Sequence, residues 1–297
     1  MKDPGEQPLY IIITPAYNEE QFIEKTIKSV LQQSILPQKW IIVDDGSTDN
    51  TAEIIQRYSR QYDFIHYHHR EKDPHLDYFA SNVFAIMEGC EETQDQSHDF
   101  LAILDADIEL PSDYYQRILH EFSQDSTLGI ASGVYADLIN GKLCPVLHDR
   151  RSTPKAIQVF RREVFEEIGG FLPLPWGGED TISCVMARMH NWKVWSFPDI
   201  EVVHLRPTGT GAVNNILSVR FKQGICEYNL RSQPLFFILK IIRRAVLERP
   251  YLLGSLFRLS GYVWAALRGD KTILPPDVVT FLRKEQLRRV FRGNAVE

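Results

Sequence analysis

The sequence predicts an α/β protein in which helices flank a mostly parallel, Rossmann-like sheet, and three observations support this. First, apolar segments typical of buried strands alternate with segments of helical spacing. Second, a polar turn directly follows three of the strand segments. Third, the 297 residues are 44% hydrophobic and 24% charged, which is ordinary for a globular protein with a substantial core. The alternation implies right-handed crossovers between parallel strands.

The expected elements follow one another in a regular order. Strands are expected near residues 10–14, 39–43, 64–68 and 100–104, and helices near 20–33, 50–61, 78–90 and 112–122. Gly46 interrupts the chain after the second strand, and Ser112 can cap the fourth helix. Between residues 129 and 161, short strand-like runs and the turn signal Asn140-Gly141 predict antiparallel additions that shape an acceptor pocket.

Asp105 and Asp107 are the most informative pair of residues in the chain. They come directly after the apolar run Ala102-Ile-Leu104, which is typical of a buried strand. In an extended chain, residues i and i+2 point to the same side. The two carboxylates can therefore converge on one hard cation and on the diphosphate that it neutralises. An isolated Asp-x-Asp pair is also compatible with a solvated strand end.

Two earlier segments have the same order of strand, polar turn and helix. One extends from Tyr10 to Glu20, and the other extends from Trp40 to Thr51. Three such joints place their polar ends along the carboxyl edge of a parallel sheet, where open α/β folds bind ligands. A nucleotide is expected to lie across this edge.

Four motifs, taken in order, resemble the signature of family 2 glycosyltransferases. They are Thr14-Pro-Ala-Tyr-Asn-Glu19, Val43-Asp-Asp-Gly-Ser-Thr-Asp49, Leu104-Asp-Ala-Asp107 and Gly177-Gly-Glu-Asp180. The resemblance covers residues 10 to about 205. It implies the GT-A fold and an inverting transfer of a sugar from a nucleotide diphosphate to a hydroxyl. The expected catalytic domain is 1–215, with a nucleotide-binding half up to about 110 and an acceptor-binding half from about 111.

The resemblance also implies a set of donor-binding residues. Tyr17 offers an aromatic face to the nucleoside. Asp45 can accept a hydrogen bond from a pyrimidine N3–H, which favours a uridine diphosphate sugar and leaves thymidine and guanosine diphosphate sugars open. Arg70 is a candidate for a phosphate contact, with a solvated loop position as the alternative. The expected donor-binding set is Thr14, Pro15, Tyr17, Glu19, Asp45, Arg70, Asp105 and Ala106.

A divalent cation, Mn²⁺ or Mg²⁺, is the expected cofactor. Both ions prefer oxygen ligands and share substrate phosphates, so one or two carboxylates suffice. Asp107 is assigned to the metal, and Asp105 to the metal or the ribose. His204 is a third candidate ligand, because family members often carry a histidine there that contacts metal or diphosphate. A structural role for His204 is the alternative.

The segment Trp176-Gly-Gly-Glu-Asp180 is expected to supply the general base. Apolar residues follow at helical spacing from Ile182, which places Glu179 and Asp180 at a helix N-terminus. The macrodipole favours a carboxylate there, while burial raises its pKa. The resemblance implies that Asp180 deprotonates the acceptor hydroxyl, with Glu179 beside it. Helix capping is the alternative role. The residues expected to bind the acceptor are Trp176, Gly177 and Gly178.

Two departures from the family pattern bear on the substrates. Many relatives carry a glycine-rich, basic run before the Asp105 motif, whereas this chain has His75-Leu-Asp-Tyr-Phe-Ala-Ser-Asn82. The sequence also has no Gln-x-x-Arg-Trp motif after Asp180, which favours addition of one sugar per encounter over processive synthesis. The expected acceptor is lipid-linked or a polysaccharide.

The region 216–297 differs from the rest in charge and is expected to be helical. It has 15 basic against six acidic residues, whereas residues 1–215 have 18 against 33. Basic residues interrupt its apolar runs well before the roughly 18–20 residues that a membrane span requires. Apolar residues recur at helical spacing at Leu252, Leu256, Leu259, Val263 and Leu267. An amphipathic helix on an anionic membrane surface and a helix packed on the catalytic domain both fit this pattern. No nucleic-acid recognition motif accompanies the basic residues.

The cysteines and the polar first residues predict a cytoplasmic location, either free or peripheral on the cytoplasmic face of a membrane. The segment from Met1 to Glu6 contains no secretory hydrophobic stretch. The four cysteines lie at least 40 residues apart, at Cys90, Cys144, Cys184 and Cys226. This spacing excludes zinc-ribbon and thioredoxin patterns and suits a reducing compartment.

Two other functions compete with sugar transfer. A sugar-phosphate nucleotidyltransferase shares the broad architecture, but Pro15-Ala-Tyr-Asn18 stands where that class has Gly-x-Gly-Thr-Arg. A binding module without activity would have no chemical reason to keep four aspartates in motif positions, namely Asp45, Asp105, Asp107 and Asp180. Transfer of a sugar is the leading hypothesis.

Overall fold

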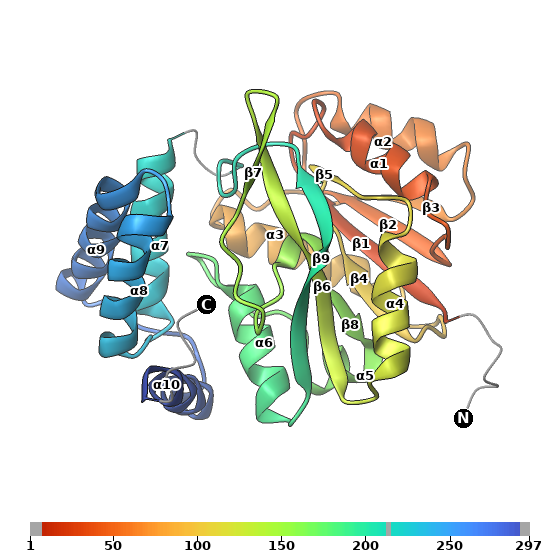
Figure 1. Ribbon diagram of the computed structural model, residues 1–297. Coiled ribbons are helices and arrows are strands. Elements are labelled where there is room, and N and C mark those ends of the chain that lie inside the picture. The colour runs from red at the N-terminus through yellow and green to blue at the C-terminus, as the bar shows by residue number, and fades with distance from the viewer. Residues whose placement is uncertain (1–7, 212–214, 292–297) are drawn as a thin grey trace.

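A computed structural model describes residues 8–211 and 215–291, in which helices cover a curled sheet and further helices gather at one side (Figure 1). The first half contains β1 (Tyr10–Ala16), α1 (Ile23–Leu31), β2 (Lys39–Asp44), α2 (Thr51–Ser59), β3 (Ile65–His69), α3 (Tyr78–Glu91), β4 (Phe100–Ile103), β5 (Ile108–Glu109) and α4 (Tyr114–Gln124). Next come β6 (Leu128–Ile139), β7 (Lys142–Pro145), the 3₁₀ helix η1 (Lys155–Ile157), β8 (Val159–Arg161), α5 (Arg162–Glu167), α6 (Glu179–Met189) and β9 (Lys193–His204). The last helices are α7 (Ile216–Asn229), α8 (Pro234–Leu247), α9 (Tyr251–Arg268) and α10 (Pro276–Phe291).

The sheet has a parallel half and a mixed half. Its strand order is β3-β2-β1-β4-β8-β6-β9-β5, with β7 paired to β6. The strands from β3 to β4 are all parallel, and so are β6 and β9, whereas β8 and β5 run antiparallel to their neighbours. The predicted α/β fold with a mostly parallel sheet is confirmed, and the strands expected over the first 104 residues lie within about a residue or two of the observed ones.

Both faces of the parallel half are covered by helices. Ile12 and Ile42 pack on one side with residues of α1, α2 and α4, while Ile13 and Val43 pack on the other with residues of α3, α5 and α6. Because successive strand residues point to opposite faces, such strands must be apolar throughout. This explains why β1 and β2 appear in the sequence as uninterrupted apolar runs.

The expected antiparallel additions are present between residues 128 and 161. β6 and β7 form a hairpin in which Ile139 pairs with Lys142. Asn140 and Gly141 connect them with φ angles of 50° and 75°. Two successive left-handed residues form the turn that matches the twist of a hairpin, and asparagine followed by glycine adopts it readily.

The C-terminal helices contact each other closely through two glycines. A Cβ atom on Gly261 of α9 would lie 2.0 Å from the carbonyl oxygen of Phe221 on α7, and one on Gly224 would lie 1.9 Å from the carbonyl oxygen of Arg258. Neither contact allows a larger residue, because the opposing atom belongs to the backbone. The two glycines therefore set the distance between α7 and α9.

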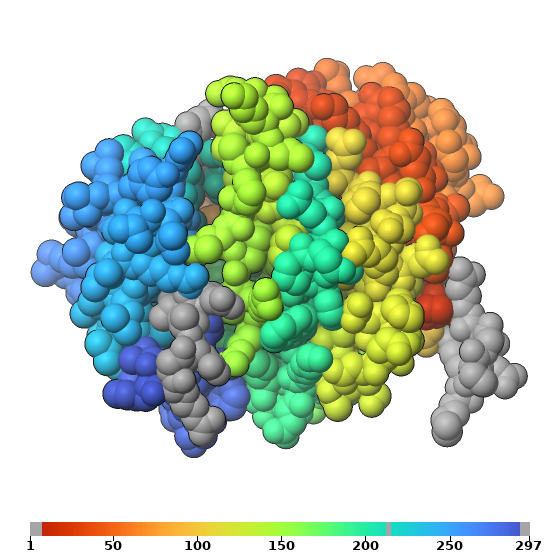
Figure 2. Space-filling view, in the orientation of Figure 1, coloured from red at the N-terminus to blue at the C-terminus, as the bar shows by residue number. Residues whose placement is uncertain are grey.

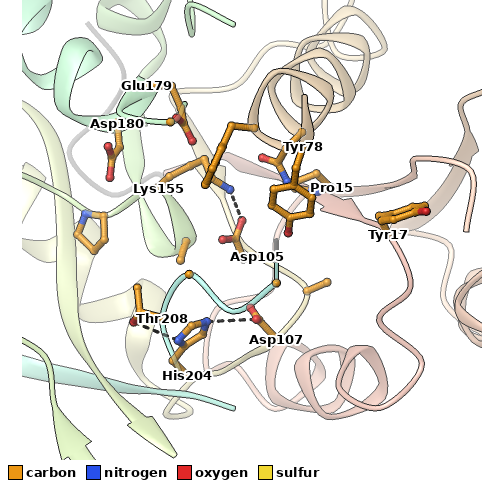
Figure 3. Close-up of a pocket in the computed structure, with 18 of the residues that line it drawn as sticks. Pro15, Tyr17, Tyr78, Asp105, Asp107, Lys155, Glu179, Asp180, His204 and Thr208 are labelled. Atoms are coloured by element: carbon orange, nitrogen blue, oxygen red, sulfur yellow. Dashed lines mark hydrogen bonds and ion pairs between the residues drawn. The ribbon is translucent and has the colours of Figure 1, made fainter. Parts of the chain in front are cut away.

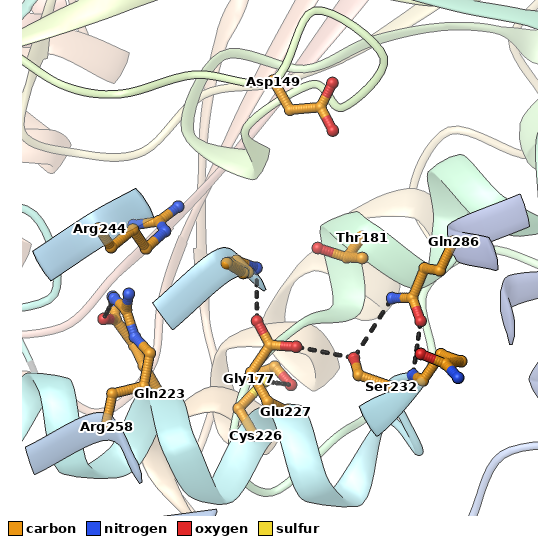
Figure 4. Close-up of polar contacts among 12 residues, drawn as sticks. Asp149, Gly177, Thr181, Gln223, Cys226, Glu227, Ser232, Arg244, Arg258 and Gln286 are labelled. Carbon is orange, nitrogen blue, oxygen red and sulfur yellow. Dashed lines mark hydrogen bonds and ion pairs between the residues drawn. The ribbon is translucent and has the colours of Figure 1, made fainter. Parts of the chain in front are cut away.

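Polar contacts, of which the one between Cys226 and Gly177 is drawn in Figure 4, and a small apolar cluster attach these helices to the part of the chain that contains the sheet. Cys226 Sγ lies 3.2 Å from the carbonyl oxygen of Gly177, and Arg188 forms a two-point ion pair with Glu285 at 2.7 and 2.8 Å. Residues of α6 and α10 share one apolar cluster, including Ile182 and Leu282. The tail is thus packed on the catalytic domain through α7 and α10.

The apolar stripe of α9 does not take part in this packing. Its members are exposed by 41–81%, namely Leu252, Leu256, Leu259, Val263 and Leu267. With its other face α9 packs on α7 and α8, so the stripe itself is left on the outer surface of the described structure. None of the described helices is long and apolar enough to cross a membrane.

The close contact of α7 and α9 makes a prediction about stability. Gly261→Ala should lower the free energy of unfolding by about 1–3 kcal/mol in urea denaturation, because overpacking forces the helices apart. Gly254→Ala on the same helix is the matched control, since its Cβ would meet the nearest atom at 3.4 Å. The control should be neutral or stabilising by up to about 1 kcal/mol through helix propensity. Equal stability of the two variants would contradict the proposed contact.

Candidate active site

A cavity of about 310 Å³ lies at the carboxyl edge of the sheet, between the catalytic domain and α7. Thirteen of the fifteen site residues expected from the sequence line it, and Figure 3 shows several of them around its centre. They are Pro15, Tyr17, Glu19, Asp45, Asp105, Ala106, Asp107, Trp176, Gly177, Gly178, Glu179, Asp180 and His204. Residues from distant parts of the chain therefore share one cleft.

The nucleotide side of the cavity is assembled by the parallel register of β1, β2 and β4. Ala16 pairs with Asp44 at the end of β2, and the backbone N–H of Asp45 donates to the carbonyl of Ala16 at 2.8 Å. The N–H of Leu104 donates to the carbonyl of Ile13 at 3.0 Å. Each motif begins where its strand ends, so the register brings the three motifs side by side.

Asp45 is held by basic and hydroxyl groups. It is 3% exposed. It accepts a hydrogen bond from Ser81 Oγ at 2.6 Å and forms an ion pair with Lys72 at 3.2 Å. The ammonium group of Lys72 also lies 3.3 Å from the centre of the Tyr17 ring. Lys72 therefore covers the aromatic face that was expected to receive a nucleoside.

Thr14 and Arg70 are the two expected donor-binding residues that do not line the cavity. Thr14 is fully buried, and its hydroxyl accepts a hydrogen bond from the indole N–H of Trp40 at 2.9 Å. Arg70 is paired with Asp45 and with Glu88. In this structure neither residue faces the cavity. Thr14 binds Trp40 in the core, and Arg70 holds the Asp45 carboxylate in place.

Asp107, His204 and Asp137 form a row across three adjacent strands. His204 pairs in register with Ile108 of β5 on one side and with Asp137 of β6 on the other. Its Nε2 lies 3.1 Å from Asp107 and its Nδ1 lies 2.8 Å from Asp137. Burial would lower the pKa of His204, but the two carboxylates outweigh it and raise the pKa to about 10. The ring is an imidazolium at neutral pH.

Arg206 connects this row to the first motif. It lies 2.6 Å from Asp107 and also pairs with Glu19. Burial would raise the pKa of Asp107, yet His204 and Arg206 together lower it below its usual range. Burial first, and then the charge of Asp107, raise the pKa of Glu19 to about 7. Neither Arg206 nor Asp137 lies in one of the four sequence motifs, so the amino-acid sequence alone does not mark them as site residues.

Asp105 is paired with a lysine from the opposite side of the cavity. Lys155 Nζ lies 2.5 Å from Asp105 Oδ1 (Figure 3). Lys155 comes from η1, which precedes β8, and β8 pairs with β4. Burial would lower the pKa of Lys155, but Asp105 and then Glu179 raise it, so the side chain stays charged. Lys155 is a third residue that no sequence motif reveals.

The donor atoms at Asp105 and Asp107 suit a divalent cation. Asp105 Oδ2 and Asp107 Oδ1 form no hydrogen bond within residues 8–211 and 215–291. Hard cations take such carboxylate oxygens and complete their shell with water and phosphate oxygens. His204 would have to lose a proton first, since both of its nitrogens face carboxylates. The described residues contain no group of three His, Cys, Asp or Glu arranged as a metal site.

Glu179 and Asp180 occupy the first turn of α6, as expected. Gly177 and Gly178 precede them with φ angles of 84° and 95°, a region that favours glycine. The N–H of Thr181 donates to Asp180 Oδ1 at 2.6 Å. Burial is the main cause that raises the pKa of Asp180. Burial and then the charge of Asp180 raise the pKa of Glu179 to about 7.

Three buried acceptor atoms at the cavity lack a hydrogen-bond partner within the described part of the chain. They are Glu19 Oε2, Asn82 Oδ1 and Glu179 Oε2. Buried polar atoms in folded proteins nearly always have a partner. Unpaired acceptors that gather in one cavity indicate a site for a polar ligand with several donor groups.

α7 forms the wall of the cavity opposite the sheet. Val219, Lys222, Gln223 and Cys226 line it. Lys222 has no ion-pair partner among the described residues, so its charge is available to an anionic ligand. The expected boundary near residue 215 thus marks a change of composition, whereas the site extends across it.

A model of glycosyl transferase family 2 matches residues 11–174, which is more than half of the chain. The chain is 32% identical over 130 residues to the putative teichuronic acid biosynthesis glycosyltransferase TuaG of Bacillus subtilis. The aligned segment covers 44% of this chain and 48% of that protein. It is 31% identical over 117 residues to the poly-β-1,6-N-acetyl-D-glucosamine synthase of Staphylococcus epidermidis. Here the aligned segment covers 39% of this chain and 26% of that protein. The chain therefore spans half or less of the length of these two relatives.

Solved structures with the same fold include three that match at low sequence identity. The mannosyltransferase PcManGT of Pyrobaculum calidifontis, in complex with GDP-Man and Mn²⁺, has a TM-score of 0.57 at 17% identity and covers 98% of this chain and 83% of its own. Staphylococcus aureus TarS with UDP-GlcNAc has a TM-score of 0.54 at 16% identity, with coverages of 74% and 66%. GalNAc-T7 with UDP, GalNAc and Mn²⁺ has a TM-score of 0.60 at 14% identity, with coverages of 98% and 58%.

These likenesses confirm the expected GT-A fold. The family model includes the first three motifs, and the fourth motif lies in the same cavity. The chain belongs to glycosyl transferase family 2.

Proposed function

We propose that the protein is an inverting glycosyltransferase that moves one sugar from a nucleotide diphosphate sugar to a hydroxyl of a lipid-linked or polysaccharide acceptor. The observation that carries this proposal is the convergence of Asp105, Asp107 and Asp180 in one cavity. Two of these carboxylates lie at the strand end where a diphosphate would bind, and the third lies at the N-terminus of α6. Family membership supports the same reaction class.

The cationic side chains around the two aspartates suit a departing diphosphate. Lys155, Arg206 and Lys222 all line the cavity, and they come from three separate elements. Positive groups that are fixed before the reaction stabilise charge that develops in the transition state. A divalent ion, held by Asp105 and Asp107, would add Lewis-acid neutralisation of the same phosphates.

Asp180 suits the role of general base. Its raised pKa keeps the carboxylate a better proton acceptor than an ordinary aspartate, and the cavity admits an acceptor hydroxyl beside it. A single in-line displacement then takes place at the anomeric carbon, and configuration inverts. Trp176, Gly177 and Gly178 lie on the same side of the cavity and are proposed to contact the acceptor.

Donor identity and cellular location are parts of the same proposal. Asp45 and Tyr17 line the nucleoside end, and a uridine diphosphate sugar is the proposed donor. The four cysteines are free, in keeping with the expected cytoplasmic location. A nucleotidyltransferase or an inactive binding module would not need a carboxylate at the position of Asp180, opposite the diphosphate site.

Asp180→Asn tests the general base. The amide cannot accept the proton, so kcat should fall by about 10²–10⁴-fold, while donor affinity stays within a few-fold of wild type. Release of nucleoside diphosphate measures the first quantity and calorimetry measures the second. Asp113→Asn, at the start of α4, is the control and should behave as wild type. Loss of donor binding in Asp180→Asn would remove Asp180 as the base.

The dependence of the rate on pH tests the coupled carboxylates. Burial raises the pKa of Asp180, and burial and then the Asp180 charge raise the pKa of Glu179 to about 7. The rate constant kcat/KM should therefore rise with pH as the pair loses its protons, with the last step near 7. Glu179→Gln removes the carboxyl group that titrates near 7, so the last step of the profile should disappear and the rate should level off at lower pH. An unchanged profile in Glu179→Gln would contradict this coupling.

Thermal unfolding with nucleotide and metal tests the donor site. UDP with Mn²⁺ should raise the unfolding temperature, by mass action, more than either component alone. Asp105→Ala should abolish the increment that depends on Mn²⁺, because one of the two carboxylates is lost. Asp199→Ala is the control, because the Asp199 side chain is 74% exposed and does not line the cavity. If Mn²⁺ still raised the unfolding temperature of Asp105→Ala in the presence of UDP, the assignment of Asp105 as a metal ligand would be wrong.

A further inference from the structure

The outer surface of α8 and α9 is unusually apolar. Of the 21 large hydrophobic residues exposed in the described chain, 14 lie on these two helices. They are Leu235, Ile238, Ile242, Val246, Leu247, Tyr251, Leu252, Leu253, Leu256, Phe257, Leu259, Val263, Trp264 and Leu267. The helices lie at the outside of the molecule, away from the sheet, as Figures 1 and 2 show in blue. Apolar patches of this extent mark surfaces that bind a protein or a membrane.

The exposed residues form continuous stripes along the two helices. On α8 the stripe passes through Leu235, Ile238, Ile242 and Val246, and on α9 it follows the spacing from Leu252 to Leu267. The opposite face of α9 is buried through Gly254, Arg258, Gly261 and Ala265. The stripes meet at the short connection between the helices, where Val246 and Leu252 are exposed by 70% and 65%. We name this surface the α8–α9 face.

The α8–α9 face carries positive charge without exposed negative charge. Residues 234–268 contain six basic residues and one acidic residue, Glu248. Of the six, Arg258 is buried on the opposite face, and Lys240, Arg244 and Arg268 have carboxylate partners. The Glu248 side chain is 16% exposed and is paired with Arg220, Arg244 and Arg258, which hold its pKa at about 2 even though burial would raise it. Arg243 and Arg249 form no ion pair within the described residues. Their charges are free to meet an anionic surface.

A basic cavity opens beside the stripe of α8. It has a volume of about 70 Å³ and is lined by Lys240, Arg243 and Arg244 of α8 together with His148 and Asp149. Arg243 is the one of these three basic side chains that forms no ion pair within the described residues. An anionic lipid suits this arrangement. Its headgroup meets the basic side chains of the cavity, and its acyl chains meet the exposed apolar residues Ile238 and Ile242 on the same helix. A second copy of this chain suits the face less well. Two such faces in contact would bring arginines together without carboxylates between them.

We infer that the α8–α9 face binds the surface of an anionic lipid bilayer, with its apolar residues at the level of the acyl chains and its arginines at the phosphates. Basic side chains with long apolar stems suit such a position. The helices lie on the membrane and do not cross it, since Arg258 and Arg268 interrupt α9. α7 lines the catalytic cavity with one face and packs on α9 with another. The membrane would therefore lie close to the cavity, which favours a lipid-linked acceptor; this consequence rests on the proposed function.

Vesicle flotation with the full chain tests the apolar part of the inference. Wild-type protein should float with vesicles of phosphatidylglycerol and phosphatidylcholine, and at least about tenfold less with phosphatidylcholine alone. The triple variant Val246→Ser, Leu252→Ser and Leu256→Ser should lose flotation. A triple variant at exposed residues of the catalytic domain, Leu36→Ser, Tyr62→Ser and Leu143→Ser, is the matched control and should float as wild type. Circular dichroism and thermal unfolding verify that both variants fold.

Charge reversal tests the electrostatic part. Arg243→Glu with Arg249→Glu should lower the vesicle partition coefficient at least about 30-fold at low salt, since each basic residue near an anionic surface contributes a factor of about five. Lys25→Glu with Arg60→Glu changes the same charge at exposed positions of the nucleotide half and should have little effect. Added salt should weaken wild-type binding by screening.

Three results would overturn the inference. They are no flotation of the wild type, equal flotation of the wild type and the α8–α9 triple variant, and a dimer in light scattering that the triple variant disperses while vesicles bind neither protein. The last result would assign the face to a second copy. Vesicle binding needs no nucleotide sugar, so its failure leaves the proposed activity standing, and absence of nucleotide release leaves the membrane surface standing.

Discussion

The ion-pair row through Asp107 links the end of the parallel half of the sheet to the mixed half, beyond the pairing of β4 with β8. Asp107 follows a strand of the parallel half, while His204 and Asp137 belong to strands of the mixed half, and Arg206 extends the row to Glu19. Each charge in this row is buried or nearly so, and a buried charge without a partner is costly. The groups therefore hold each other in place. The nucleotide motifs form one side of the cavity and the end of β9 forms the other. Because the network joins these two sides, it fixes the distance between them.

The C-terminal helices belong to the site as much as the sheet does. α7 closes the cavity with Lys222 and Cys226, and two glycines hold it against α9. A close backbone contact transmits position between helices, since no flexible side chain lies between them. The same arrangement that closes the cavity turns the apolar stripe of α9 outward. Site and outer surface are thus two consequences of a single helix packing.

Much of the fold and of the site could be predicted because the signals are local. β1, β2 and β4 are apolar runs that end in polar turns, and parallel strands bring their carboxyl ends to one edge. Seven of the predicted residues line the cavity for this reason, namely Pro15, Tyr17, Glu19, Asp45, Asp105, Ala106 and Asp107. Thr14 and Arg70 show the limit of that argument. Thr14 lies in a motif and Arg70 lies directly after β3. In both cases the direction of the side chain decides whether the residue faces the ligand or contacts the residues that do.

The amino-acid sequence by itself determined the order of the strands and helices, the positions of the motif carboxylates and the charge of the tail, because each depends on residues close together in the chain. Tertiary structure alone decided that Lys155 pairs with Asp105, that Asp137 and Arg206 complete the row at Asp107, and that α7 is a wall of the cavity. These contacts join residues 50 to nearly 190 positions apart. No periodic pattern records such a pairing, since it arises only when sheet register and helix packing bring the segments together.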